Sequence, residues 1–216
     1  MAEKYVEDER YEEAIALFSD VKNKFPYSKL ATEAELKIAD VQYARESYIE
    51  AQTAYEVFKE LHPKHPRSDY VTYRLGMSLF NQLPSTIDRD LSLAERAIVY
   101  YQEVIRSFPS SEFVASSKEH RLKCREMLAE KQYYIGEFYA VRKMHESAVA
   151  RYDELLATFP ESKTVPQTLA AASRSSLALK DKAKAAFYFE QLKERFPKTP
   201  EFSNLQSEIG NELSVK

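Results

Sequence analysis

The chain has 216 residues, of which 30% are charged and 44% belong to the hydrophobic class. This balance excludes a disordered tail, and no run approaches the roughly 18–20 apolar residues that a bilayer-spanning helix requires. Lysine and arginine number 31 against 34 aspartates and glutamates, with no basic block, so nucleic acid is not expected as a partner. The 3 glycines and 9 prolines indicate a chain with few tight turns.

A helical pattern recurs five times along the chain. Each occurrence has an alanine, an aromatic residue four positions later, an apolar residue three further on and a proline five beyond that. Apolar residues three or four apart share one helix face, and proline ends the helix. This pattern is typical of the second helix of a tetratricopeptide (TPR) unit. The alanine and proline that bound each pattern are Ala14 and Pro26, Ala51 and Pro63, Ala97 and Pro109, Ala148 and Pro160, and Ala185 and Pro197.

The first helices of the repeats agree with this pattern. Gly76 in repeat 3 and Gly136 in repeat 4 occupy the small-residue position, where we expect two helices to pack closely. Repeat 3 then needs about nine extra residues, which fall in a segment around 82–92 whose composition is typical of a loop insertion. In repeat 1, Met1 falls about six positions inside the first helix. We therefore expect sequence upstream of Met1, so the lack of a signal peptide says nothing about compartment.

The second half of the chain predicts a long helix. Pro109 and Pro160 stand 51 residues apart, so a helix of roughly 25–30 residues is expected between Glu112 and Lys143. The fold class is thus all-α, an α-solenoid of five TPR repeats with a long helix leading into repeat 4. We expect residues 1–110 to form repeats 1–3 as a substrate-binding half. Residues 111–216 then form repeats 4–5, a partner-binding half that an amphipathic C-terminal segment closes.

Five further segments of the chain carry a resemblance to a known family. They are His62-Pro63-Lys64-His65-Pro66, Asp69-Tyr70-Val71-Thr72-Tyr73 with Gly76, Asp88-Arg89-Asp90, Phe108-Pro109-Ser110-Ser111-Glu112-Phe113, and Glu137-Phe138-Tyr139-Ala140-Val141-Arg142. Together they resemble the TPR lipoprotein subunit of the bacterial outer-membrane β-barrel assembly machine, the outer membrane protein assembly factor D family. The resemblance spans roughly residues 3 to 200.

The resemblance implies a non-enzymatic scaffold and receptor without a cofactor. Members of the family engage unfolded outer-membrane proteins through their N-terminal repeats, including an aromatic-rich C-terminal strand. Their C-terminal repeats contact the periplasmic domain of the barrel-forming subunit, and accessory lipoproteins complete the complex. Members of the family carry their lipid on an N-terminal cysteine. The single cysteine of this chain, Cys124, lies inside a predicted helix and cannot be that residue. The resemblance thus implies that the full-length protein lies at the periplasmic face of the outer membrane. Its only attachment to the membrane would be an N-terminal lipid anchor that is absent from this chain.

We expect the client-binding groove on the concave face that the first helices build. Tyrosine and methionine suit adaptable apolar capture with a polar handle. The alternative for several of these residues, Phe80 above all, is ordinary packing between repeats. The expected groove residues are Leu36, Asp40 and Tyr43 in repeat 2, and Tyr70, Tyr73, Met77 and Phe80 in repeat 3.

Arg142 is the expected partner-binding residue, since it aligns with a family arginine used in the contact with the barrel-forming subunit. An arginine at a helix end suits a partner carboxylate through bidentate pairing. The alternative is a solvated charge that favours the negative end of the helix dipole.

No catalytic or metal-binding set emerges from the sequence. Ser19 and Lys22 match an S-x-x-K string, but its companion motifs are missing. His62 and His65 have possible metal spacing without further ligands nearby, so a proline-rich turn explains them better. The alternative function is a generic periplasmic or cytosolic TPR adaptor, either a Tol-associated cell-division coordinator or a co-chaperone. A co-chaperone would need a Lys, Asn and Arg clamp, where this chain has Lys37, Asp40 and Arg74.

Overall fold

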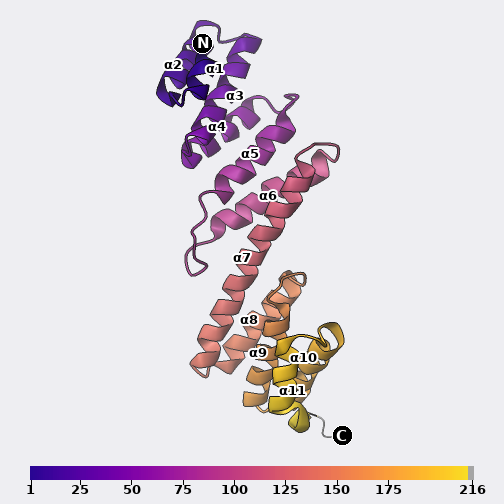
Figure 1. The fold of residues 1–216 in the computed structure, drawn as a ribbon. Coiled ribbons are helices and arrows are strands. Elements are labelled where there is room, and N and C mark those ends of the chain that lie inside the picture. Colours follow the sequence, from indigo (N-terminus) through magenta and orange to yellow (C-terminus); the bar gives the residue numbers. More distant parts are fainter. Residues whose placement is uncertain (214–216) are drawn as a thin grey trace. The chain divides into compact units, whose positions relative to one another are not determined.

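The computed structural model describes residues 1–213, with side chains described through residue 209 (Figure 1). This range is helical, and no strand occurs within it. The helices are α1 Ala2–Glu7, α2 Tyr11–Lys24, α3 Lys29–Ala44, α4 Tyr48–Leu61, α5 Ser68–Phe80, α6 Ser92–Ser107, α7 Val114–Val141, α8 His145–Thr158, α9 Val165–Ala178, α10 Lys182–Arg195 and α11 Pro200–Leu213.

The helices pair as five TPR units, which confirms the predicted solenoid. First helices α1, α3, α5, the C-terminal part of α7, and α9 each precede a second helix. The alanine of each repeat pattern is fully buried, because a small side chain there lets the paired helices approach. The aromatic that follows is also buried in repeats 2 to 5, whereas Phe18 of repeat 1 is half-buried. The repeat alanines are Ala14, Ala51, Ala97, Ala148 and Ala185.

Four repeats join their two helices through the same turn. One residue of each turn adopts a left-handed conformation, with φ between 57° and 64°. In repeat 2 the backbone N–H of Glu46 donates to Tyr43 O, and that of Ser47 donates to Gln42 O, both at 3.0 Å. This pairing is the Schellman motif that satisfies the last carbonyls of a helix. The left-handed residues are Glu9, Glu46, Lys143 and Lys180.

Two glycines lie where a tyrosine of the paired helix crosses the first helix. A Cβ added at Gly76 would lie 2.6 Å from Cε1 of Tyr101, and one added at Gly136 would lie 2.3 Å from Cε1 of Tyr152. Both distances are shorter than a carbon–carbon contact permits, so a residue without a side chain is required. The expected close packing at these two glycines is confirmed.

The long helix and the loop insertion are also confirmed. Helix α7 has 28 residues, and an eleven-residue connection, 81–91, joins α5 to α6. The chain divides into two compact units inside α7: residues 1–85 with 90–124, and residues 86–89 with 125–216. We call these the first and the second unit. The expected boundary near residue 110 lies before α7, whereas this division falls within the helix.

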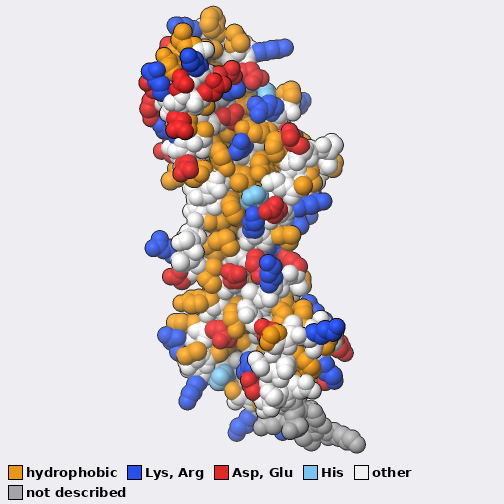
Figure 2. Space-filling view, in the orientation of Figure 1, with side chains coloured by type: hydrophobic (Ala, Val, Ile, Leu, Met, Phe, Trp, Pro, Cys, Tyr) orange, Lys and Arg blue, Asp and Glu red, His pale blue; other side chains and the backbone are white. Residues whose placement is uncertain are grey.

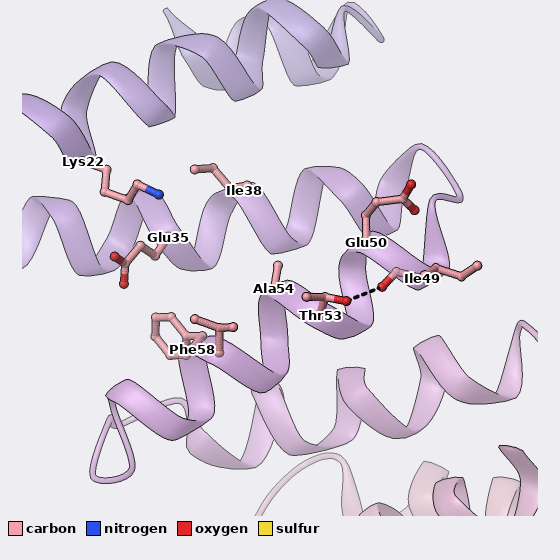
Figure 3. A pocket seen from close by; sticks show the side chains of 9 residues that line it. Lys22, Glu35, Ile38, Ile49, Glu50, Thr53, Ala54 and Phe58 are labelled. Carbon is pink, nitrogen blue, oxygen red and sulfur yellow. Dashed lines mark hydrogen bonds between the residues drawn. The ribbon is translucent and has the colours of Figure 1, made fainter.

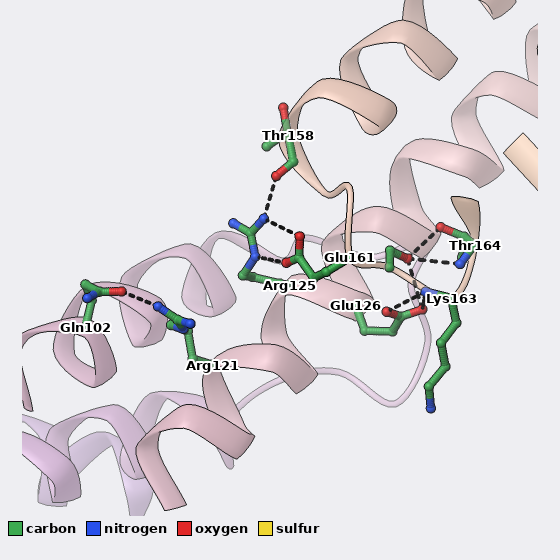
Figure 4. A network of polar contacts seen from close by, with 9 residues as sticks. Gln102, Arg121, Arg125, Glu126, Thr158, Glu161, Lys163 and Thr164 are labelled. Atoms are coloured by element: carbon green, nitrogen blue, oxygen red, sulfur yellow. Dashed lines mark hydrogen bonds and ion pairs between the residues drawn. The ribbon is translucent and has the colours of Figure 1, made fainter. Parts of the chain in front are cut away.

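Polar contacts fix α7 separately in each unit (Figure 4). In the first unit, Arg121 donates to Gln102 of α6. In the second unit, Arg125 pairs with Glu161 and donates to Thr158 O at the end of α8. Cys124 lies on α7 with no exposed surface, and burial raises the pKa of its thiol to about 12.

Candidate protein-binding surfaces

The first helices of the first unit bring three of the predicted groove residues together. Asp40 on α3 accepts hydrogen bonds through Oδ1 from the hydroxyls of Tyr55 and Tyr70, each at 2.7 Å. Arg74 on α5 donates from Nε to the Tyr70 hydroxyl at 3.1 Å. Its guanidinium lies 4.4 Å from the ring centroid of Tyr43. Asp40, Tyr43 and Tyr70 therefore form one network, and Arg74 belongs to it.

Burial changes the acidity of the tyrosines in this network. Desolvation raises the pKa of Tyr70 above its usual range, and the neighbouring Asp40 carboxylate raises it further. The same two causes raise the pKa of Tyr55. Both hydroxyls thus stay protonated at neutral pH and donate to Asp40. Both hydroxyl protons are used within the network, so the group that it presents to a ligand is the half-buried Tyr70 ring.

Tyr73 and Met77 continue the surface along α5. The ring of Tyr73 stacks on Phe113, with centroids 4.9 Å apart and an interplanar angle of 17°. Its hydroxyl lies 2.8 Å from Ser116 Oγ. Met77 Sδ accepts a hydrogen bond from the Tyr101 hydroxyl at 3.3 Å. We call Asp40, Tyr43, Tyr70, Tyr73 and Arg74 the first-helix surface.

Two of the expected groove residues lie elsewhere. Leu36 is 1% exposed and packs in the core with Tyr55 and Leu75, so its side chain does not line a surface. The expectation for Leu36 is therefore corrected: its position on α3 faces the paired helix α4. Phe80 is half-buried with its ring centroid 5.1 Å from that of His120, which is packing between helices as the alternative reading had it.

A hollow between α1 and α3 adjoins Asp40, and no sequence pattern predicts it. It has a volume of about 490 Å³ and an apolar floor that includes Val6, Phe18 and Val41. Glu3, Glu7, Lys37 and Asp40 provide the charged groups of its lining. In the space-filling view, charged side chains gather over α1 and α2, whereas apolar side chains are more prominent over α5 and α6 (Figure 2).

A second hollow lies on the second-helix side of the first unit (Figure 3). Its volume is about 390 Å³, and α2, α3 and α4 line it. Ile38, Ala54 and Phe58 give it an apolar floor, and Lys22 and Glu35 stand at its edge. This hollow shares none of the predicted groove residues.

In the second unit, Arg142 lies on an exposed apolar surface at the turn between α7 and α8. Its Nη1 donates to Phe138 O at 3.0 Å, and its guanidinium carbon lies 3.5 Å from the centroid of the Phe138 ring. The Phe138, Val141 and Met144 side chains are 44%, 78% and 49% exposed. We call these four residues the α7–α8 turn surface. Sequence reasoning identified the arginine and missed the apolar residues, whose exposure depends on where α7 ends.

The histidines of the proline-rich turn pair with carboxylates. His62 Nε2 lies 2.8 Å from Glu35 Oε2, and His65 Nε2 lies 3.7 Å from Glu33 Oε1. Among residues 1–213, no group of three or more histidine, cysteine, aspartate or glutamate side chains is placed to hold a metal ion. No helix in this range is both long and apolar enough to cross a bilayer.

Comparison with known proteins gives consistent matches. The family of outer membrane lipoproteins called YfiO matches residues 1–179, and a tetratricopeptide repeat family matches residues 171–199. "Outer membrane protein assembly factor BamD" of Neisseria gonorrhoeae is 27% identical over 199 residues, covering 88% of this chain and 74% of that protein. The protein of the same name from Caulobacter vibrioides is 23% identical over 159 residues, covering 74% of this chain and 52% of that protein.

Among solved structures, the "TPR2AB-domain:pHSP90-complex of yeast Sti1" matches with a TM-score of 0.49 and 14% identity. The match covers 99% of this chain and 83% of that one. The TPR fold itself rests on the helix pairs, the buried alanines and the glycine–tyrosine contacts described above. The family match covers well over half of the sequence. This chain therefore belongs to the YfiO family of outer membrane lipoproteins.

Proposed function

We propose that this protein is a non-enzymatic scaffold in the assembly of β-barrel proteins into the bacterial outer membrane. In this role it works at the periplasmic face of that membrane, with accessory lipoproteins as further partners. The proposal is supported by family membership and by the names of the relatives, which are assembly factors. It assigns one surface to unfolded clients and another to the barrel-forming subunit.

The first-helix surface receives the client. An unfolded outer-membrane protein offers extended segments with exposed aromatic side chains, and tyrosine rings bury such side chains at low entropic cost. Tyr43, Tyr70 and Tyr73 supply these rings, and the Asp40 hydrogen bonds hold Tyr70 in place. A preorganised surface of this kind loses little conformational entropy on binding.

The α7–α8 turn surface receives the periplasmic domain of the barrel-forming subunit. Exposed Phe138, Val141 and Met144 surround Arg142, and this combination of apolar contact with one arginine is typical of interface centres. This exposed apolar surface is the single observation that supports the assignment best. An arginine that is only a solvated charge at the end of a helix would not need exposed apolar side chains around it.

A binding experiment tests the assignment of the α7–α8 turn surface. Immobilised protein is titrated with the purified periplasmic domains of the same organism's barrel-forming subunit, comparing the wild type with Arg142→Glu. We expect the charge reversal to weaken binding at least tenfold, about 1.4 kcal/mol. The matched control is Lys180→Glu, which makes a similar charge change at the corresponding turn of repeat 5 and should bind as the wild type does.

The client surface is tested with a fluorescent peptide that has the sequence of an outer-membrane protein's last strand. Tyr73→Ala should weaken its binding at least fivefold and leave the binding of the periplasmic domains unchanged. Peptide binding that survives Tyr73→Ala would remove the client from this surface. Binding of the periplasmic domains that Arg142→Glu leaves unchanged would keep the assembly role and move the site. A folded wild type that binds neither the peptide nor the periplasmic domains would favour a generic TPR adaptor.

A further inference from the structure

A row of uncharged, mostly apolar side chains follows the exposed side of α4. Its members stand four residues apart and therefore share one side of the helix: Ile49, Thr53, Val57 and Leu61. Ile49 and Leu61 are 66% and 61% exposed, and Thr53 and Val57 are exposed as well. We call these four residues the α4 row. A contiguous exposed apolar surface of this kind marks a site of interaction with another molecule.

The other repeats provide an internal comparison for the α4 row. Counted from the repeat alanine, the four equivalent positions include at least one charged residue in every other second helix. These positions hold Glu12, Ala16, Asp20 and Lys24 in α2, Glu95, Val99, Glu103 and Ser107 in α6, Glu146, Ala150, Glu154 and Thr158 in α8, and Ala183, Phe187, Gln191 and Arg195 in α10. Because the repeats share one packing pattern, packing within the solenoid does not account for the missing charge in α4. Contact with another molecule does.

The hollow on the second-helix side of the first unit adjoins the α4 row (Figure 3). Ile49, Thr53 and Val57 belong to its lining, together with the apolar floor described above. Its volume of about 390 Å³ gives room for apolar side chains of a ligand. The row and the hollow thus form a ridge beside a groove, and ridges of residues four apart are what one helix packs against another.

The hydrogen-bonding groups of the α4 row decide which secondary structure fits it. Thr53 carries the one side-chain hydroxyl of the row, and this hydroxyl donates to Ile49 O at 3.1 Å (Figure 3). An extended segment lying on the row would leave its own backbone N–H and C=O groups without partners there. A helix satisfies these groups internally and needs only apolar side chains three and four residues apart. The row therefore fits an amphipathic helix.

The unpaired charges of α4 are negative. A carboxylate lies at each end of the row, Glu50 beside its first residue and Glu60 beside its last. Both are exposed, and neither forms an ion pair within the described part of the chain. The only cation of α4, Lys59, pairs with Glu103 of α6, and the one cation that lines the hollow, Lys22, comes from α2. A helix with basic side chains beside its apolar stripe therefore complements α4.

We infer that the α4 row and its hollow bind an amphipathic helix of another protein, whose apolar stripe is flanked by lysine or arginine. A second copy of this chain is disfavoured, because two rows facing each other would bring four carboxylates together. The same carboxylates repel an anionic membrane surface. The site shares no residue with the first-helix surface or with the α7–α8 turn surface. The inference thus goes beyond the proposed function and does not depend on it.

Fluorescence anisotropy with designed helical peptides tests the inference. The first peptide has about 18 residues, enough to span the row, with leucines three and four apart and lysines on both sides of the leucine stripe. A second peptide has glutamate in place of each lysine. A third has the composition of the first, with its leucines distributed around the helix. We expect the protein to bind the first peptide at least tenfold more tightly than either of the others.

Variants of the row separate its apolar and charged contributions. Ile49→Ser/Val57→Ser should weaken binding of the lysine-flanked peptide at least tenfold. Val99→Ser removes an exposed apolar side chain at an equivalent position of α6, and this matched control should bind as the wild type does. Glu50→Gln/Glu60→Gln should still bind the leucine stripe, with at most about a threefold preference for lysine over glutamate flanks. Circular dichroism verifies that each variant keeps its helices.

Each contrary result overturns a stated part of the inference and leaves the proposed function standing. A wild type that binds none of the peptides would remove the helix site. Equal binding of the lysine- and glutamate-flanked peptides would remove the basic partner. Self-association in sedimentation, or binding to phosphatidylglycerol vesicles, that Ile49→Ser/Val57→Ser abolishes would assign the row to a second copy or to a membrane. A photo-crosslinking leucine analogue in the stripe should label α2 or α4, and labelling confined to other helices would overturn the location.

Discussion

The two units use the same packing device with different polar partners. In the first unit, Gly76 lets Tyr101 cross α5, and the buried Tyr101 hydroxyl donates to the sulfur of Met77. In the second unit, Gly136 lets Tyr152 cross α7, and the Tyr152 hydroxyl donates to Glu137 Oε1 at 2.5 Å. Met77 and Glu137 each directly follow the glycine in sequence.

The difference shows which part of the repeat is fixed by packing. The glycine and the tyrosine ring are constrained by volume, since no side chain fits between them. The hydroxyl only needs an acceptor, and either a thioether or a carboxylate supplies one, although the carboxylate makes the stronger bond.

Alkaline pH should unfold both units. Burial raises the pKa of Tyr101 and of Tyr152, and it raises that of Tyr133 to about 12. A tyrosine in an unfolded chain ionises near pH 10, about where its model compounds do. The stability that these tyrosines contribute is therefore complete below about pH 10 and is lost as the pH rises above that value.

Tyrosinate absorbance and helix content, followed together, check this expectation. Part of the tyrosine absorbance should appear only together with the loss of helix. Ionisation of all tyrosines in one step while the helices persist would contradict the buried assignment.

Replacing either glycine with alanine should destabilise its unit. Overpacking of this kind costs about 1–3 kcal/mol, against a gain of up to about 1 kcal/mol in helix propensity. We expect Gly136→Ala to cost more than Gly76→Ala, because the added Cβ comes closer to the ring in the second unit. Urea unfolding measures the difference. Adding Tyr152→Leu to Gly136→Ala should recover part of the loss, and a further additive loss would show that the contact is not the cause.

Removing the Tyr101 and Tyr152 hydroxyls, one at a time, should destabilise the two units by different amounts. Tyr152→Phe removes the hydrogen bond from the Tyr152 hydroxyl to Glu137 and should cost about 1 kcal/mol. Tyr101→Phe removes only a weak hydrogen bond to sulfur and should cost about 0.3 kcal/mol. Thermal unfolding of the two variants measures this pair of values. Equal costs would mean that the acceptor makes no difference.

Glycine at the repeat turns should stabilise both units equally. A left-handed conformation costs a non-glycine residue about 1–2 kcal/mol, and glycine loses about 0.5–1 kcal/mol in chain entropy. Glu46→Gly and Lys143→Gly should thus each gain about 0.5 kcal/mol in urea unfolding. Lys118→Gly, at an exposed helical position of α7, serves as the control and should lose about 1 kcal/mol. A gain in only one unit would mean that the two turns are not equivalent.

Much of the fold was predictable because the same residue pattern occurs in each of the five repeats. The alanine–aromatic–apolar–proline pattern identified five second helices, and the spacing of Pro109 and Pro160 identified α7. The groove was harder to predict, because helical periodicity does not say which of two faces meets the partner helix. Leu36 and Asp40 are four residues apart on α3, yet Leu36 is buried and Asp40 reaches the surface network. Likewise, the hollow beside α1 depends on Glu3 and Lys37, which are 34 residues apart.

The buried thiol of Cys124 is a natural probe of local opening in the first unit. With no exposed surface and a pKa of about 12, this sulfur is inert while its surroundings in the first unit stay closed. A thiol reagent in excess therefore reacts at the rate at which the first unit opens around Cys124, and the chain has no second cysteine to add a competing signal. The labelling rate, measured with and without a client peptide, would then show whether the peptide slows the opening of that unit, and no engineered probe is needed.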